Sequence, residues 1–92
     1  MIRSFRSRDT ERLFHDGDVP RFRQFGRVAR RKLLLLHWAK TLNDLRSPPG
    51  NRIEPLRGDR AGQYSIRINE KWRICFRWKE RDALDVEIVD YH

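Results

Sequence analysis

The sequence ends on Asp90, Tyr91 and His92, three side chains that can each hold or transfer a proton. They follow directly on residues 85–89, an alternating run of polar and apolar side chains that is typical of a β-strand. Chain ends usually fray, but a strand would hold these side chains in place. We therefore expect the three residues to form part of a site.

Cleavage of RNA requires no metal when the substrate's own 2′-hydroxyl attacks the phosphate. The protein must then supply a base for that hydroxyl, cations for the charge that develops on the phosphate, and an acid for the departing 5′-oxygen. Glu54, Tyr91 and His92 can move protons. Residues that can hold phosphate or stack on a base are Arg57, Arg60, Arg67, Arg73, Arg77, Tyr64 and Tyr91. No nucleotide-binding or metalloprotease motif occurs, so we expect neither a cofactor nor a metal.

Arginine dominates the charge of this chain of 92 residues. The formal net charge is +8, and 17 of the 21 basic residues are Arg. The planar guanidinium matches phosphate oxygens in a bidentate manner. The composition therefore favours nucleic acid as a partner over an anionic membrane or an acidic protein, although a solvated basic surface has the same composition.

The length is that of one small domain, residues 1–92, without repeats or linkers. Cys75 is the only cysteine, which excludes an intrachain disulfide and a zinc site built on several cysteines. Charges lie at the start of the chain, where a secretory signal has its apolar stretch, and the apolar run from Leu33 to Leu36 is too short to span a bilayer. We expect a cytoplasmic protein that does not contact the membrane.

The first half of the chain is expected to be mostly helical. Apolar residues recur at spacings of three and four between Arg21 and Lys40, which predicts one long helix. Three apolar residues lie off this stripe and can belong either to the core or to a partner-binding surface: Leu34, Leu35 and Trp38. Shorter elements are a strand at Ile2 to Phe5, a helix that Asp9 or Thr10 caps and that runs through Leu13 and Phe14, and a helix at Thr41 to Leu45.

The second half is expected to be an antiparallel meander. A Ser-Pro-Pro-Gly-Asn turn at residues 47–51 precedes three alternating runs, residues 64–69, 72–78 and 84–89. Helices followed by a meander predict an α+β fold in which the N-terminal helices cover one face of a small, mostly antiparallel sheet.

Alternation assigns the side chains of these strands to two faces of the sheet. The face toward the helices receives Tyr64, Ile66, Ile68, Trp72, Ile74, Phe76, Trp78, Leu84, Val86 and Ile88. The opposite face receives Ser65, Arg67, Arg73, Cys75, Arg77, Glu87 and, at its end, Tyr91. Arginines on one open surface repel one another unless an anion binds there, so a solvated face and an anion-binding face are both compatible with the pattern.

Three stretches, residues 53–67, 72–76 and 86–92, resemble the HigB family of bacterial toxins, also called plasmid-maintenance killer proteins, within the RelE/ParE superfamily. The resemblance covers essentially the whole chain and is closest to the GraT branch, whose Arg-Ser-Pro-Pro-Gly-Asn-Arg stretch matches residues 46–52. It implies a compact RelE-like ribonuclease that enters the ribosomal decoding site and cuts messenger RNA there. It also implies a HigA-type helix-turn-helix antitoxin as partner, with the toxin alone a monomer and the complex a hetero-oligomer.

Residue by residue, the resemblance makes Asp90, Tyr91 and His92 the catalytic end and Arg73 the sheet arginine. The chain departs from the pattern at Glu54, which stands where studied relatives have His before Pro-Leu-Lys. A carboxylate is ordinarily a weaker base than an imidazole, so we expect a milder nuclease. In the working scheme Glu54 or His92 accepts the 2′-proton, Arg57 and Arg73 stabilise the transition state, and His92 protonates the leaving oxygen. Asp90 orients, and Tyr91 stacks or hydrogen-bonds.

Other functions fit parts of the pattern. ParE-type members of the same superfamily poison DNA gyrase and cut no RNA, so the fold alone does not decide the activity. The arginine face would also suit a non-catalytic RNA- or ribosome-binding protein, or a decayed toxin that retains only antitoxin binding and DNA autoregulation. The pair Tyr91-His92 favours the nuclease, because a gyrase-binding protein has no evident use for it.

Overall fold

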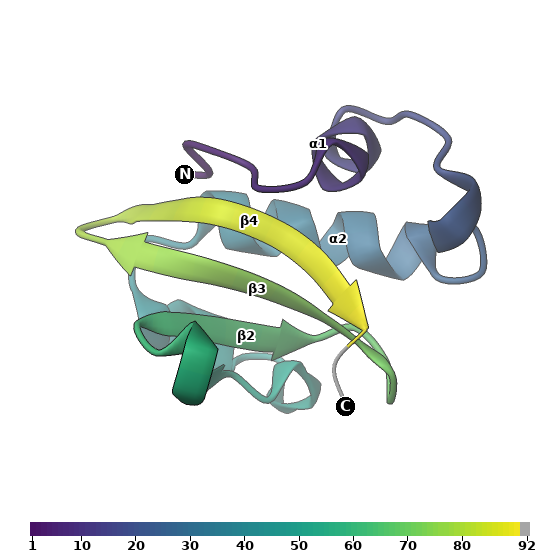
Figure 1. Cartoon of the computed structure of the whole chain (residues 1–92). Helices are drawn as coiled ribbons and strands as arrows, with labels where there is room; N and C mark the ends of the chain where they lie inside the picture. The colour runs from purple at the N-terminus through teal and green to yellow at the C-terminus, as the bar shows by residue number, and fades with distance from the viewer. Residues whose placement is uncertain (91–92) are drawn as a thin grey trace.

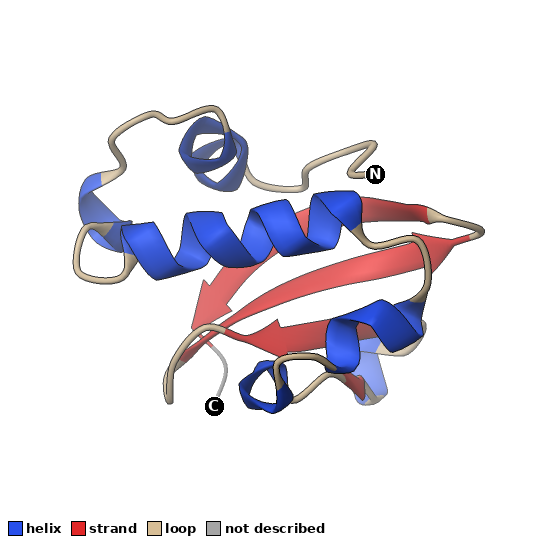
Figure 2. Cartoon of the chain, turned by 180° about the vertical axis from the view of Figure 1, so that it is seen from behind, coloured by secondary structure: helices blue, strands red, loops and turns tan. Residues whose placement is uncertain are grey.

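Two helices and a four-stranded antiparallel sheet form the framework of residues 1–90, the part of the chain that the computed structural model describes (Figure 1). Helix α2 crosses one face of the sheet, and α1 packs beside α2 and β4 (Figure 2). The predicted α+β class, with helices on one sheet face, is confirmed. The sheet order is β1-β2-β3-β4, and the elements are α1 (Arg8–Phe14), α2 (Gly26–Trp38), β1 (Glu54–Pro55), β2 (Gln63–Arg67), β3 (Trp72–Lys79) and β4 (Asp82–Asp90). Four short 3₁₀-helices are η1 (Pro20–Phe22), η2 (Leu42–Arg46), η3 (Pro49–Asn51) and η4 (Gly58–Arg60).

Helix α2 is shorter than the predicted helix from Arg21 to Lys40. Pro20 opens the separate turn η1, and α2 begins only after Phe25, whose backbone is not helical. At the other end Ala39 is extended and stops the helix. The predicted apolar stripe is confirmed by its buried members Ala29, Leu33 and Leu36.

Three apolar side chains of α2 face solvent instead of the core. Leu34 is 43% exposed, Leu35 37% and Trp38 70%. Together with Arg31, Ala39 and Asp44 they line an open groove of about 370 Å³. The alternative that these three residues belong to the core is therefore wrong. The alternative that they form a partner-binding surface is retained. Within residues 1–90, no helix is both long and apolar enough to cross a membrane.

The N-terminal segment lies along the outer edge of β4. Ile2 and Phe5 form parallel bridges to Ala83 and Val86, and backbone hydrogen bonds such as Arg3 N–H to the Ala83 carbonyl, 2.8 Å, tie the two together. The predicted strand at this position is thus reduced to two isolated bridges. Because an open strand edge is a template for further pairing, this segment also protects β4.

Within residues 1–90 the strands direct their side chains as predicted, with one exception. Alternation assigns Leu84 to the core face, but Ala83 is the buried residue and Leu84 pairs with Arg77 on the opposite face. A β-bulge causes the shift: the register changes between Cys75 and Arg77, and Asp85 has a left-handed backbone with φ of 53°. Because of this extra residue, the side chains of β4 that precede Asp85 point to the face opposite to the one that simple alternation predicts. Ile66, Ile74, Phe76, Val86 and Ile88 occupy the core as expected.

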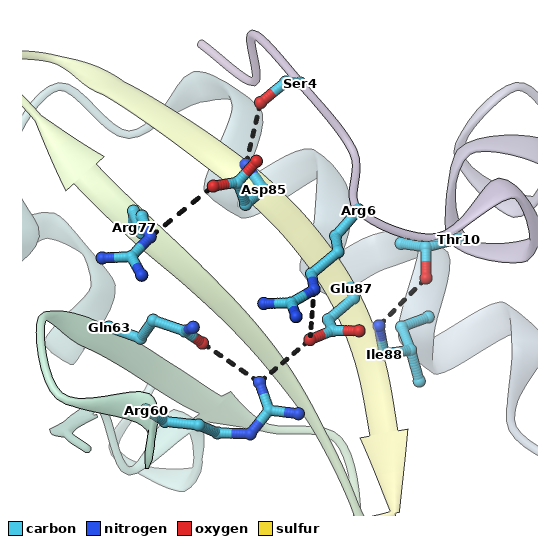
Figure 3. Close-up of polar contacts among 9 residues, drawn as sticks. All are labelled: Ser4, Arg6, Thr10, Arg60, Gln63, Arg77, Asp85, Glu87 and Ile88. Atoms are coloured by element: carbon cyan, nitrogen blue, oxygen red, sulfur yellow. Dashed lines mark hydrogen bonds and ion pairs between the residues drawn. The ribbon is translucent and has the colours of Figure 1, made fainter. Parts of the chain in front are cut away.

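Thr10 connects α1 to the last strand. The cap of α1 is Ser7, not Asp9 or Thr10, and its Oγ accepts a hydrogen bond from the Thr10 N–H at 3.2 Å. The Thr10 side chain turns inward instead, and its Oγ1 accepts the Ile88 N–H at 2.9 Å (Figure 3). Both partners are buried, so water cannot replace this contact.

We predict that Thr10→Val lowers the free energy of unfolding by about 1–3 kcal/mol, because valine keeps the shape and leaves the Ile88 N–H without an acceptor. Urea unfolding followed by circular dichroism measures this loss. Thr10→Ser keeps the hydroxyl and should retain more of the stability than valine does. Equal unfolding midpoints for wild type and Thr10→Val would contradict the assignment.

Candidate active site

The strand register places four side chains in one row across the sheet. Glu54 of β1 pairs with Ser65 of β2, Ser65 pairs with Cys75 of β3, and Cys75 pairs with Glu87 of β4. Directly paired residues share a face, and this face is the one opposite the core residues Ile66 and Ile74. The row therefore crosses the face away from the helices, with one acidic residue at each end.

Arg73 lies across this row and is held rigidly. Its Nε donates to Ser65 Oγ at 2.6 Å, and its Nη2 donates to the Arg52 carbonyl at 2.7 Å. Only 11% of its side chain is exposed. The Glu54 carboxylate, which is half exposed, lies 3.7 Å from Arg73 Nη2. The structure thus brings together two of the predicted catalytic residues, a carboxylate and a fixed guanidinium, at the β1 edge of the sheet.

Asn51 fixes the turn that supplies the Arg52 carbonyl. Its buried side chain donates to the carbonyls of Leu45 and Ser47, at 3.1 and 3.2 Å, and accepts a hydrogen bond from Lys32 Nζ of α2. The next residue, Arg52, adopts a left-handed backbone with φ of 44°, which aims its carbonyl at Arg73. Asn51 therefore orients Arg73 indirectly.

Lys32 shares this corner of the fold. Partial burial, assisted by the neighbouring positive charges of Arg31 and Arg67, lowers the pKa of Lys32. No pattern in the sequence indicates Lys32 or Asn51 as a residue near the site by residue type or spacing alone. The position of Asn51 directly after Pro-Pro-Gly indicates only a turn residue, since Asn side chains commonly bond the backbone of their own turn.

A second arginine, Arg60, contacts the row at its β4 end, where Glu87 lies. Arg60 of η4 reaches across β2 and β3, and its Nη1 donates to Gln63 Oε1 at 3.1 Å and to Glu87 Oε1 at 2.9 Å (Figure 3). Glu87 is only 15% exposed, and Arg6 approaches the same oxygen at 3.9 Å. Burial beneath this face raises the pKa of Cys75 to about 11, so its thiol is protonated at neutral pH. Cys75 is accordingly a packing residue, as predicted.

The remaining candidates are more scattered. Arg57 is exposed just before η4, and Arg67 at the end of β2 donates to the Asn69 carbonyl at 3.1 Å. Arg77 lies 3.6 Å from Asp85, and Asp90 lies 3.5 Å from Lys71. Tyr91 and His92, two of the predicted catalytic residues, lie outside the described residues.

Tyr64 lies on the other side of the sheet from these arginines. It pairs with Pro55 and Phe76, and its ring packs against Phe76 with the centroids 6.2 Å apart. Strand alternation had already assigned it to the helix-facing side. It is half-buried and lines a cavity that also includes Glu54, around the β1 edge.

The expected repulsion among arginines is offset within the fold. The face is not an open surface, because Ser65 and Cys75 are fully buried. Carboxylates accompany the guanidiniums in three ion pairs: Arg73 with Glu54, Arg60 with Glu87, and Arg77 with Asp85. Within residues 1–90, no three His, Cys, Asp or Glu side chains gather in a way that could hold a metal ion.

Comparison with known proteins places the sequence among toxins. Residues 3–92 match the family described as "RelE-like toxin of type II toxin-antitoxin system HigB". The chain is 33% identical to "Endoribonuclease HigB" of Proteus vulgaris over 100 aligned positions that cover 100% of both proteins. It is 47% identical to "Toxin HigB-1" of Vibrio cholerae serotype O1 over 55 residues, a match that spans 60% of this chain and only 58% of that protein.

The fold has counterparts among solved structures. A "YoeB-YefM complex from Staphylococcus aureus" contains a chain that superposes with a TM-score of 0.57 and 18% sequence identity, covering 100% of this chain and 98% of that one. At this level of identity the likeness concerns the fold alone. It confirms the RelE-like arrangement of helices and sheet.

We predict that Asn51→Ala lowers the free energy of unfolding by at least about 2 kcal/mol, because three buried or partly buried partners lose their hydrogen bonds together. Asn43→Ala is the matched control: this exposed Asn should contribute less than about 0.5 kcal/mol. Chemical denaturation of both variants provides the comparison. Similar midpoints for the two would show that Asn51 does not hold the turn.

Proposed function

Because this chain belongs to the family of RelE-like toxins of the type II toxin-antitoxin system HigB, we propose that it is an endoribonuclease that inhibits growth by cutting messenger RNA. The observation that carries the proposal is the half-exposed Glu54 carboxylate 3.7 Å from the nearly buried guanidinium of Arg73. A proton acceptor beside a fixed cation is the pair that phosphodiester cleavage requires. The similarity to a protein named as an endoribonuclease supports the same reaction.

In the proposed reaction Glu54 takes the proton of the substrate's 2′-hydroxyl. The 2′-oxygen then bonds to the phosphorus while the bond to the 5′-oxygen breaks, which leaves a 2′,3′-cyclic phosphate and a 5′-hydroxyl. Arg73 and Arg57 stabilise the negative charge that develops on the phosphate oxygens. His92 protonates the departing 5′-oxygen, Asp90 orients, and Tyr91 stacks or hydrogen-bonds. The family resemblance supplies these three roles.

Arg73 suits this role because its position is set before the substrate arrives. Hydrogen bonds to Ser65 and Arg52 hold the guanidinium, so little reorganisation is needed as charge develops. The ion pair with Glu54 is long, at 3.7 Å, and the carboxylate is half exposed. An incoming phosphate can therefore take over the contact with Arg73 and leave Glu54 to face the 2′-hydroxyl.

The proposal extends to partners and to the site of action. We expect cleavage in the ribosomal decoding site and neutralisation by a HigA-type helix-turn-helix antitoxin, both of which the family resemblance implies. The exposed groove of α2 that Leu34, Leu35 and Trp38 line is the candidate antitoxin surface. The stretch from Arg46 to Arg52 supports placement in the GraT branch.

Mapping of RNA 5′ ends after induction tests the proposed function. New ends at codon-defined positions should appear in cells and in a translating extract, and they should vanish when ribosomes are removed. A chain that lacks Tyr91 and His92 should produce no such ends. Growth arrest without new ends would instead indicate a target other than RNA, and undiminished cleavage by the shortened chain would refute the role of its last two residues.

We predict that Glu54→Gln lowers the cleavage rate by about 10²–10⁴-fold, the usual contribution of a general base. Glu70→Gln, an exposed glutamate in the β2–β3 hairpin, is the control and should leave the rate unchanged. Rates from single-turnover assays on a programmed ribosome give the comparison. A fully active Glu54→Gln variant would leave His92 as the base.

Glu54→His serves as the rescue variant. An imidazole loses its basic form below its ordinary pKa of about 6.5, so this variant should recover activity near pH 8 and lose it at a higher pH than the wild type does on acidification. An acid limb of the pH–rate profile at the same position in both proteins would show that residue 54 does not accept the proton.

A further inference from the structure

A small cavity opens beside Glu54 at the β1 edge of the sheet. Its volume is about 210 Å³. The 3₁₀-helix η2 forms one side of the cavity. Ile53, strand β1 and Tyr64 of β2 form the other side. The lining side chains used below are Leu42, Asn43, Arg46, Ile53, Glu54 and Tyr64.

The walls of this cavity are apolar and fixed. Leu42 and Ile53 are half-buried and pack against the core. Tyr64 packs on Phe76, which holds the tyrosine ring in place while leaving it half-buried at the cavity. An aromatic ring flanked by aliphatic side chains is a surface on which a planar base can stack.

The rim of the cavity is polar. Asn43 is exposed and carries a carboxamide, which can both donate and accept hydrogen bonds. Arg46 is exposed beside it and provides a positive charge for a phosphate. The places of Asn43 and Arg46 in η2 are well defined, because two hydrogen bonds fix the start of this 3₁₀-helix. The Thr41 hydroxyl accepts the Asp44 N–H, and the Asp44 carboxylate accepts the Thr41 N–H.

We propose that this cavity binds one nucleobase of the RNA substrate, that of a nucleotide next to the cleaved phosphate. The inference rests on the proposed function, because Glu54 both pairs with Arg73 and lines the cavity. The volume lies below the ~300–1,000 Å³ of pockets for drug-sized ligands, which suits a single base more than a whole nucleotide. Tyr64 stacks on the base, Asn43 contacts its edge, and Arg46 pairs with an adjoining phosphate.

The test is a titration of the intact, isotope-labelled chain with the four ribonucleoside 5′-monophosphates, followed by NMR. Ribose 5-phosphate, which has the sugar and phosphate without a base, is the control ligand. The monophosphates should shift the amide signals of Asn43, Ile53 and Tyr64, and ribose 5-phosphate should not. Equal shifts from all five ligands, or none from any, would overturn the proposal.

Two sets of variants assign the binding to the named side chains. Tyr64→Leu should weaken monophosphate binding roughly 5- to 150-fold, the loss that follows removal of one stacking platform, whereas Tyr64→Phe should bind about as well as the wild type. Asn43→Ala should change the order in which the chain prefers the four monophosphates. Gln24→Ala, which also removes an exposed carboxamide, should leave that order unchanged. Unchanged affinity in Tyr64→Leu, or an unchanged ranking in Asn43→Ala, would remove that residue from the site.

The same spectra show that each variant is folded. If Tyr64→Leu does not fold, the comparison of Asn43→Ala with Gln24→Ala still decides the proposal. Because the titration measures no cleavage, its result is independent of the nuclease assay. A chain that binds bases at this cavity but cuts no RNA would refute the proposed function alone, and a chain that cuts RNA without binding bases there would refute this inference alone.

Discussion

The charge of Arg73, almost entirely withdrawn from water, is the constraint on which the candidate site depends. A buried guanidinium is strongly destabilising unless its N–H groups are hydrogen-bonded and its charge is balanced. Ser65 on the adjacent strand, the Arg52 carbonyl and the Glu54 carboxylate meet these requirements from three different segments. The turn before β1 therefore cannot move independently of the sheet, and this coupling keeps a carboxylate beside a cation.

Carboxylates balance part of the charge of the basic face before any ligand arrives. Glu54, Asp85 and Glu87 each lie near an arginine. In the proposed function, an RNA phosphate would replace a carboxylate as the partner of its arginine. In the same proposal the net positive charge would attract RNA over distance, and the geometry of the pairs would decide which phosphate can replace a carboxylate. Glu54 and Asp85 are about equally exposed, whereas Glu87 is nearly buried, and Glu54 is the one assigned a chemical role.

The regular parts of this fold were readable from the sequence, and the irregular parts were not. Alternation along β2 and β3 assigned the two sheet faces correctly. Residue type placed Glu54 and Arg73 among the candidates, and the family resemblance selected them. The same alternation failed at Leu84, because the bulge at Asp85 adds a residue that no local pattern marks. Asn51 was overlooked because its importance comes from Lys32, a partner 19 positions away on another element.

The residues at the start of the sequence complete the sheet beside its last strand. Arg3 and Arg6 donate backbone hydrogen bonds to Ala83 and Val86, and Met1 accepts one from Ala83. Such contacts join positions about eighty residues apart, and pairings of this kind form late and slowly. All 17 arginines precede β4 in the sequence, so during synthesis they are made before the strand that pairs with the N-terminal segment. The N-terminal segment can therefore reach its place in the sheet only after β4 has been made.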